Sequence, residues 1–156
     1  MKVLAIDHIA LAVSDLDAAK HNFCDMLGAE FILEHKREDT MYTVAYTAWG
    51  SECLTLVHPD DPRCFIQKAI DAKGEGLHHM GIEVDDLDAA EAEFISKGGK
   101  VGPKETIPGV RREFVVAPKN NCGLLLQVME FMPPYKGIAP AARYRMLAED
   151  VNLCKG

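Results

Sequence analysis

The chain has 156 residues, a hydrophobic content of 48% and a formal net charge of −7 at pH 7. This size and composition are typical of one globular domain, and the acidic charge argues against nucleic acid or an anionic membrane as the main partner. No apolar run is long enough to span a bilayer, and the N-terminus lacks the small-residue cleavage site of a signal peptide.

The cysteines favour a reducing location. There are five of them, an odd number, and no two form a Cys-x-x-Cys pair. This usage is typical of free thiols and not of a disulfide framework or a zinc knuckle. We therefore expect a cytoplasmic protein whose thiols are reduced: Cys24, Cys53, Cys64, Cys122 and Cys154.

Residues 1–60 predict a strand, a helix and three further strands. Ile9, Leu11 and Val13 alternate with residues of a second face, which is the period of a strand, and we expect them to pack against the helix that follows. Ser14 or Asp15 can cap that helix, whose apolar stripe is Leu16, Ala19, Phe23 and Leu27. Strand-like runs then follow at 30–34, 42–49 and 52–58.

A linker and a second module come next. The linker at 61–76 contains a predicted helix at 63–73. Residues 77–131 predict the same order of elements as the first module, with strands near 80–84, 100–101, 112–117 and 124–129. The C-terminal tail, 132–156, contains the sequence PPYKG and a possible closing helix at 141–149.

The two modules are copies of one unit. When His8 is aligned with His79, 71 positions later, seven of thirteen residues match between DHIALAVSDLDAA and HHMGIEVDDLDAA. The same offset aligns Phe23 with Phe94. Self-similarity at a fixed offset indicates a duplicated structural unit, and each copy keeps a histidine in its first strand.

Strand alternation places both histidines on the face opposite the apolar packing residues. By the same parity, the last strand of each module places Thr55 or Gln127 on that face. Two sheets related by a pseudo-twofold axis would bring these four side chains together. We therefore predict an α+β fold in which two tandem βαβββ modules, 1–60 and 77–131, form one domain, a curved mixed-sheet cup spanning residues 1–131.

This pattern resembles the vicinal oxygen chelate superfamily, which includes glyoxalase I, extradiol dioxygenases, fosfomycin-resistance proteins and methylmalonyl-CoA epimerase. The order strand-helix-three-strands is duplicated, with a histidine near the start of each copy. The phrases LVHP, GLHHMGIEVDDLDAA and APKNNCGLLLQV look most like the epimerase branch. The resemblance covers the chain to about Phe131, and one such scaffold hosts many chemistries.

The resemblance implies a divalent metal, held by one residue from the first strand and one from the last strand of each module. Neutral imidazoles at His8 and His79 suit Zn, Co, Ni, Mn or Fe. The epimerases have a carboxylate where this chain has Gln127, and Gln or Glu where it has Thr55, so the site lacks an anionic ligand. We expect His8, His79 and Gln127 to be the ligands, with weakened metal binding and Thr55 beside the substrate. A buried, hydrogen-bonded glutamine is the alternative for Gln127.

The resemblance also points to a general base in the turn between the second and third strands, where this chain has Glu38 and Asp39. Charges solvated in a polar turn are the alternative for both. Arg112, expected on the cup face, matches an arginine of the epimerases and could hold a substrate carboxylate or phosphate. Tyr46 adds aromatic binding surface. Because Gln127 cannot accept a proton, chemistry on one face of the substrate suits the cup better than two-base epimerisation.

Two functions stay open. The first is a metal-dependent lyase, isomerase or epimerase that acts on a small acyl or acyl-CoA substrate. The second is a metal-poor protein that binds a drug or metabolite, as bleomycin-resistance members of the superfamily do. The paired histidines favour the enzyme, and the missing carboxylate favours the binder. Of the two, we favour the enzyme. We expect a homodimer in either case, without a nucleic-acid or membrane partner.

Overall fold

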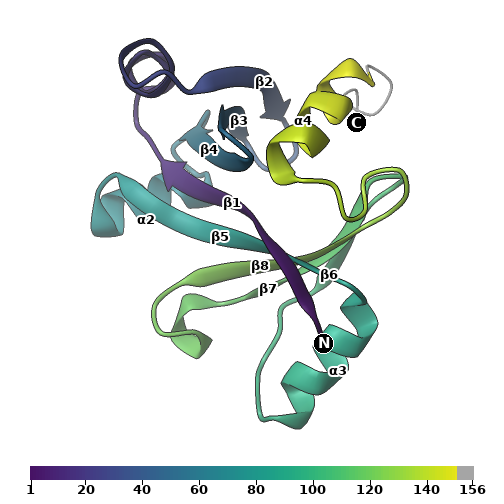
Figure 1. Cartoon of the computed structure of the whole chain (residues 1–156). Helices are drawn as coiled ribbons and strands as arrows, with labels where there is room; N and C mark the ends of the chain where they lie inside the picture. Colours follow the sequence, from purple (N-terminus) through teal and green to yellow (C-terminus); the bar gives the residue numbers. More distant parts are fainter. Residues whose placement is uncertain (151–156) are drawn as a thin grey trace.

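The computed structural model describes residues 1–150 of the chain, so Cys154 lies outside the described residues. Eight strands form one continuous mixed sheet in the order β2-β3-β4-β1-β5-β8-β7-β6, which curls around a concave face (Figure 1). The first module contains β1 (Val3–Ala12), α1 (Leu16–Lys20), the π-helical turn η1 (His21–Met26), β2 (Glu30–Arg37), β3 (Tyr42–Trp49) and β4 (Glu52–Pro59). The predicted order of elements in this module is confirmed.

The second module repeats the first after a linking helix, α2 (Phe65–Lys73). It contains β5 (Gly76–Val84), α3 (Leu87–Ser96), β6 (Lys104–Ile107), β7 (Arg111–Val116), the 3-10 turn η2 (Pro118–Asn120) and β8 (Leu125–Phe131). A last helix, α4 (Pro140–Glu149), follows. The two modules do not form separate sheets, because β1 pairs with β5 in antiparallel fashion and joins their inner edges. The predicted α+β cup is confirmed as a single curled sheet.

The repeated acidic sequence, SDLDAA at 14–19 and DDLDAA at 85–90, starts a helix in each module. Asp15 accepts a hydrogen bond from the backbone N–H of Ala18, and Asp86 accepts one from Ala89. Both are N-cap residues with extended backbone, an arrangement that satisfies an otherwise unpaired N–H of the first turn. The aspartates of this phrase that cap α1 and α3 are therefore explained by helix initiation.

Two local predictions were wrong. The short strand expected at 100–101 begins only at Lys104, as β6. The preceding residue, Pro103, has no N–H to donate to a neighbouring strand, so pairing starts after it. Ile9 does not pack against a helix: 41% of its surface is exposed on the outer side of β1, whereas Leu11 and Val13 do pack in the cluster that contains α1.

Helix α4 packs into the concave side of the sheet, beside β2 and β3 (Figure 1). Its Tyr144 and Leu147 join a buried cluster with Met129 and Phe131 of β8. The helix therefore fills part of the cup and leaves the rest open. None of the helices within residues 1–150 is long and apolar enough to cross a membrane.

Candidate metal and substrate site

A β-bulge near the middle of β1 turns two consecutive side chains toward the concave face. The pairing of β1 with β5 shifts register between Ile6 and His8, and the extra residue is Asp7. Normal alternation would send Asp7 to the outer face, but a bulge sets two residues against one on the partner strand. Asp7 and His8 are both buried as a result.

The bulge brings His8 against the histidine of the second module. The Nε2 atoms of His8 and His79 lie 3.1 Å apart. Two nitrogens that each ligate one metal at about 2.0–2.1 Å in tetrahedral geometry would be about 3.3 Å apart. The two imidazoles therefore already stand close to the separation that a shared metal requires.

The second ring nitrogen of each histidine, Nδ1, lies within hydrogen-bonding distance of a neighbouring side chain. Nδ1 of His8 lies 2.7 Å from Oδ2 of Asp7, which fixes its proton on that side because a carboxylate only accepts. Nδ1 of His79 lies 2.8 Å from Nδ1 of His78. Partners of this kind orient metal-binding histidines and set which nitrogen faces the metal.

His79 is held in the neutral state that a metal ligand needs. Burial lowers its pKa well below the ordinary value, and the neighbouring imidazoles of His8 and His78 and the guanidinium of Arg111 disfavour a further positive charge there. Burial likewise lowers the pKa of His78. A neutral imidazole keeps a lone pair for coordination.

Gly81 on β5 provides the space for the His8 ring. A Cβ at this position would lie 2.6 Å from Cε1 of His8 and 2.8 Å from Cε of Met129. No side chain fits there without moving the imidazole. The glycine is thus required by the close approach of the ring.

Gln127 and Thr55 line the same cavity as the two histidines, one of about 210 Å³. The Nε2 of Gln127 donates a hydrogen bond of 2.7 Å to Oε1 of Glu113. The hydroxyl oxygen of Thr55 is buried and has no hydrogen-bond partner within the described chain. A buried hydroxyl without a partner is costly, and a ligand in this cavity would supply one.

The donor set therefore fits a divalent metal, although it is unusually neutral. Within residues 1–150, no three His, Cys, Asp or Glu side chains are placed to hold one ion. The candidate ligands are two imidazoles and the amide oxygen of Gln127, with Thr55 close by. Such a set offers nitrogen and neutral oxygen donors but no negative charge, so a substrate oxygen would complete the shell.

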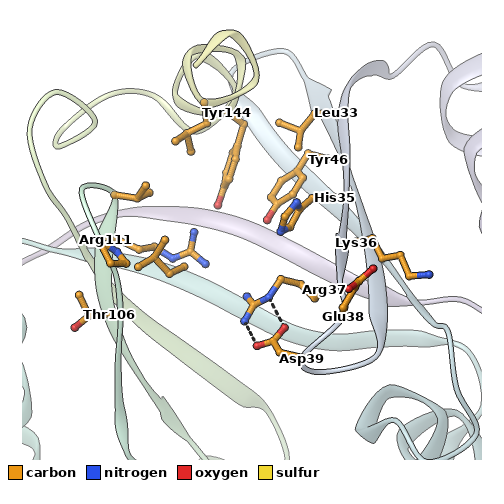
Figure 2. A pocket seen from close by; sticks show the side chains of 14 residues that line it. Leu33, His35, Lys36, Arg37, Glu38, Asp39, Tyr46, Thr106, Arg111 and Tyr144 are labelled. Atoms are coloured by element: carbon orange, nitrogen blue, oxygen red, sulfur yellow. Dashed lines mark hydrogen bonds and ion pairs between the residues drawn. The ribbon is translucent and has the colours of Figure 1, made fainter. Parts of the chain in front are cut away.

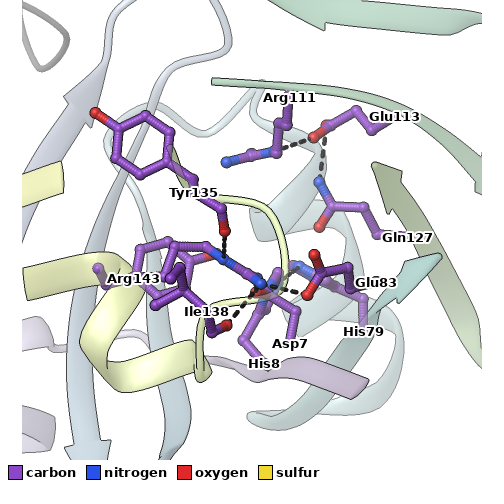
Figure 3. A network of polar contacts seen from close by, with 11 residues as sticks. Asp7, His8, His79, Glu83, Arg111, Glu113, Gln127, Tyr135, Ile138 and Arg143 are labelled. Atoms are coloured by element: carbon purple, nitrogen blue, oxygen red, sulfur yellow. Dashed lines mark hydrogen bonds and ion pairs between the residues drawn. The ribbon is translucent and has the colours of Figure 1, made fainter. Parts of the chain in front are cut away.

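A buried network of charges lies behind the histidines (Figure 3). Arg143 of α4 is fully buried and forms ion pairs with Asp7 and with Glu83 of β5. It also donates to the backbone oxygens of Tyr135 and Ile138. The charge of the buried Asp7, which orients His8, is therefore balanced by a residue of α4.

Tyr144 strengthens the same connection. Its hydroxyl donates a hydrogen bond of 2.6 Å to Asp7, and its ring lies against that of Tyr46. Burial alone would raise the pKa of Asp7, but the hydrogen bond and charge of His8, together with Arg143, outweigh it and lower the pKa. Asp7 thus stays ionised.

A second, larger cavity of about 900 Å³ shares Arg37, Tyr46 and Arg111 with the smaller one. Arg37 and Arg111 point into this space from opposite walls (Figure 2). Tyr46, expected to bind substrate, lines both cavities and lies beside Tyr144. Each guanidinium is already paired with a carboxylate, Arg37 with Asp39 and Arg111 with Glu113, so an anionic ligand here would share or replace those partners.

Arg112 does not lie on the cup face, so that prediction was wrong. It pairs across the sheet with Glu130, and its guanidinium forms ion pairs with Asp88 of α3 and Glu130. The apolar residues of β7 that face α3 are Phe114 and Val116, which share its parity. The cup face of β7 carries Arg111 and Glu113 instead, and sequence reasoning missed both. The alternation in RREFVV contained the signal, because its apolar even positions mark the packing face.

The two carboxylates predicted as bases lie in the turn between β2 and β3 and line the larger cavity. Asp39 forms a two-pronged ion pair with Arg37, which lowers its pKa to about 2. Glu38 makes no hydrogen bond to another side chain within residues 1–150. Asp39 is therefore a poor proton acceptor, and Glu38 is the better candidate base.

Comparison with known proteins agrees with this geometry. Residues 7–115 match the Glyoxalase/Bleomycin resistance protein/Dioxygenase superfamily. The mitochondrial methylmalonyl-CoA epimerase of Mus musculus is 30% identical over 81% of this chain and 73% of its own.

Two solved structures share the fold. Methylmalonyl-CoA epimerase from Mycobacterium tuberculosis has a TM-score of 0.76 at 28% identity and covers 84% of this chain and 90% of its own. A Streptomyces coelicolor methylmalonyl-CoA epimerase variant in complex with 2-nitronate-propionyl-CoA has a TM-score of 0.75 at 25% identity, over 83% of this chain and 98% of its own. With its duplicated modules and its matched histidines, the chain belongs to the Glyoxalase/Bleomycin resistance protein/Dioxygenase superfamily.

Proposed function

We propose that the chain is a metal-dependent epimerase that acts on a small acyl-CoA thioester carrying a second carboxylate. The observation that carries this proposal is the 3.1 Å approach of the His8 and His79 Nε2 atoms. The cavity around them shares the lining residues Arg37, Tyr46 and Arg111 with a larger one of about 900 Å³. The named relatives act on methylmalonyl-CoA, a substrate of this class.

An enzyme rather than a passive binder was the favoured prediction, and the relatives of assigned activity confirm it, since they are epimerases. The metal, the substrate and the mechanism are our proposal for this chain. Support for them comes from the residues that line the two cavities.

His8, His79 and the amide oxygen of Gln127 would hold the metal, with the Thr55 hydroxyl next to it. When bound, a divalent cation would act as a Lewis acid that stabilises negative charge on the thioester oxygen. The protein orients the two imidazoles beforehand, through Asp7 behind one and His78 behind the other. Preorganised ligands lower the cost of binding.

Glu38 would take the acidic proton next to the thioester carbonyl. It lies in a turn at the mouth of the larger cavity, together with Arg37. Arg37 and Arg111 would bind the carboxylate and the phosphates of the substrate, because guanidinium groups match the geometry of both anions. Tyr46 would pack against the acyl portion between the two cavities.

A one-face reaction, such as a decarboxylation or a lyase step, is the second candidate. One observation favours it: Gln127 is an amide bonded to Glu113, so it cannot accept a proton on the second face of the substrate. The fate of the substrate separates the two reactions, because a decarboxylation in D2O releases CO2 and also places a solvent deuteron at C2. Epimerisation exchanges the C2 hydrogen and interconverts the two stereoisomers while the substrate is conserved, whereas a lyase consumes the substrate.

We also propose a cytoplasmic homodimer. The thiols of Cys24, Cys53, Cys64 and Cys122 are unpaired in the described chain, in line with a reducing location. Val3, Ile6 and Ile9 on β1 and Leu77 on β5 are exposed apolar side chains on neighbouring strands. Exposed apolar surface of this kind is typical of a protein interface, and sedimentation analysis tests whether a dimer forms.

The decisive experiment combines metal analysis with turnover. Purified protein is loaded with Co²⁺, Zn²⁺, Mn²⁺, Ni²⁺ or Fe²⁺ and incubated with racemic methylmalonyl-CoA in D2O. Loss of the C2 proton signal in NMR, dependent on the metal and absent after chelation, is the expected result. Metal uptake without exchange would overturn the epimerase assignment, and absence of both would leave the binding-protein function.

A further inference from the structure

The side-chain amide of Gln127 is held in one orientation by a carboxylate from the neighbouring strand. Gln127 lies on the cup face of β8, and Glu113 lies on the same face of β7. The Gln127 Nε2 donates 2.7 Å to Oε1 of Glu113. Oε2 of Glu113 accepts a hydrogen bond of 2.5 Å from Nε of Arg111. The three side chains form a short chain that ends at the cavity with the histidines (Figure 3).

The charge on Glu113 decides which end of the amide faces it. Both carboxylate oxygens of Glu113 accept hydrogen bonds, Oε1 from Gln127 and Oε2 from Arg111, with which Glu113 also forms an ion pair. An ionised carboxylate accepts hydrogen bonds and donates none. The NH2 group of Gln127 must therefore face Glu113, and its carbonyl oxygen must face away. Figure 3 shows that oxygen on the side remote from Glu113.

This orientation matters because a metal binds the oxygen of an amide and is repelled by its NH2 group. We infer that Glu113 is a positioning residue that makes Gln127 an oxygen ligand for the metal. The inference rests on the proposed metal site at His8 and His79. The ligand set itself carries no negative charge. On this inference the nearest one is the Glu113 carboxylate of β7, with Gln127 between it and the metal.

A swap of the two side chains gives the sharpest test. Glu113→Gln removes the charge, and the new amide can offer Gln127 either a donor or an acceptor. The double variant E113Q/Q127E exchanges carboxylate and amide, so that the hydrogen bond and the net charge are kept and an anionic ligand faces the metal. Glu34→Gln is the matched control, because Glu34 also lies on a strand and pairs with a cation, Lys20, but lines neither cavity.

The probe is Co²⁺, followed by calorimetry and by its visible absorption spectrum. Outer partners of metal ligands typically change affinity by about 10- to 100-fold. We expect E113Q to bind Co²⁺ about tenfold more weakly or worse, with an altered spectrum. The swap variant should bind at least as tightly as the wild-type protein, and E34Q should be unchanged. The NMR signal of the Gln127 NH2 group should also move in E113Q without any metal present.

Each outcome has a distinct meaning. If wild-type protein binds no Co²⁺, the proposed metal site fails and the inference fails with it. If the wild type binds Co²⁺ but E113Q binds equally well with the same spectrum, only the role of Glu113 is overturned. Equal weakening in E113Q and in the swap variant, both folded by circular dichroism, would indicate a structural role for Glu113 and would also overturn the inference.

Discussion

The Nε2 atoms of His8 and His79 lie 3.1 Å apart although 71 residues separate them in the chain. The duplication places each histidine near the start of its module, and the antiparallel pairing of β1 with β5 brings the two starts together. The histidine that both modules carry thus gives a pair of nitrogen donors where the two modules meet.

Replacement of one histidine should abolish metal uptake without unfolding the protein. His79→Ala removes one of two nitrogen ligands and leaves a neutral cavity, so we expect substoichiometric metal by mass spectrometry after loading. His21→Ala is the control, because His21 lies on the surface and pairs only with Asp25 among the described residues. Metal content in the His79 variant equal to that of the control would contradict the shared site.

Gly81→Ala should displace the His8 ring. The added methyl would stand 2.6 Å from Cε1 of His8, so either the imidazole or the strand must move. Overpacking of this kind costs about 1–3 kcal/mol of unfolding free energy, and the metal affinity should fall at least as much as for an outer-partner mutation. Urea unfolding and Co²⁺ titration measure the two effects separately. Unchanged Co²⁺ affinity in Gly81→Ala would contradict the close contact between position 81 and the His8 ring.

Arg143 should be among the most stability-sensitive residues of the chain. Arg143→Met leaves the buried carboxylates Asp7 and Glu83 without their counter-ion, and breaking a buried pair this way costs about 3–5 kcal/mol. Arg145→Ala, two positions further along α4, breaks only an exposed pair with Glu30 and should have a much smaller effect, because solvent screens such pairs. Chemical denaturation compares the two. Similar midpoints for both variants would disprove the central role of Arg143.

Glu38→Gln and Asp39→Asn should separate the two carboxylates of the β2–β3 turn. The first removes the candidate base, and a lost general base lowers the rate by about 10²- to 10⁴-fold. The second removes a carboxylate whose pKa is already about 2, so its direct effect on proton transfer should be small. Exchange of the C2 hydrogen in D2O provides the rate. A larger loss in the Asp39 variant would reverse the assignment.

The ion pair between Asp39 and Arg37 predicts a pH dependence. The folded-state pKa of Asp39, about 2, lies below its ordinary value of 3.8, so the pair stabilises the folded protein fully above pH 3.8. That contribution is lost as the pH falls from 3.8 through about 2. Because the carboxylate is largely exposed, solvent screening keeps the contribution small. NMR titration of the Asp39 carboxyl carbon measures the pKa, and a midpoint near 4 would rule out the pair in solution.

Much of the architecture could be predicted from the repeat. The offset between His8 and His79 implied two equivalent modules, and strand parity placed His79 and Gln127 on one face. Both inferences use only local periodicity, which a sequence displays directly. The prediction for β7 failed because Arg112 was assigned to the cup face, although its parity is that of the packing residues Phe114 and Val116.

The rest of the site depends on features that periodicity does not encode. The bulge at Asp7 interrupts alternation, so a strand pattern assigns this residue to the outer face. The partners of Asp7 are Arg143 and Tyr144, which come from a helix in the tail rather than from either module. Long-range contacts between charged groups leave no trace in the spacing of apolar residues.

The dependence of Asp7 on α4 has a consequence for the making of the protein. Arg143 follows Asp7 by 136 positions, so a ribosome synthesises both modules before the buried carboxylate meets its counter-ion. Domains fold as they emerge, yet here both modules are complete before the orienting partner of His8 is neutralised. Metal loading should therefore follow the synthesis of α4, and a nascent chain arrested at residue 131 should contain the histidines without a competent site.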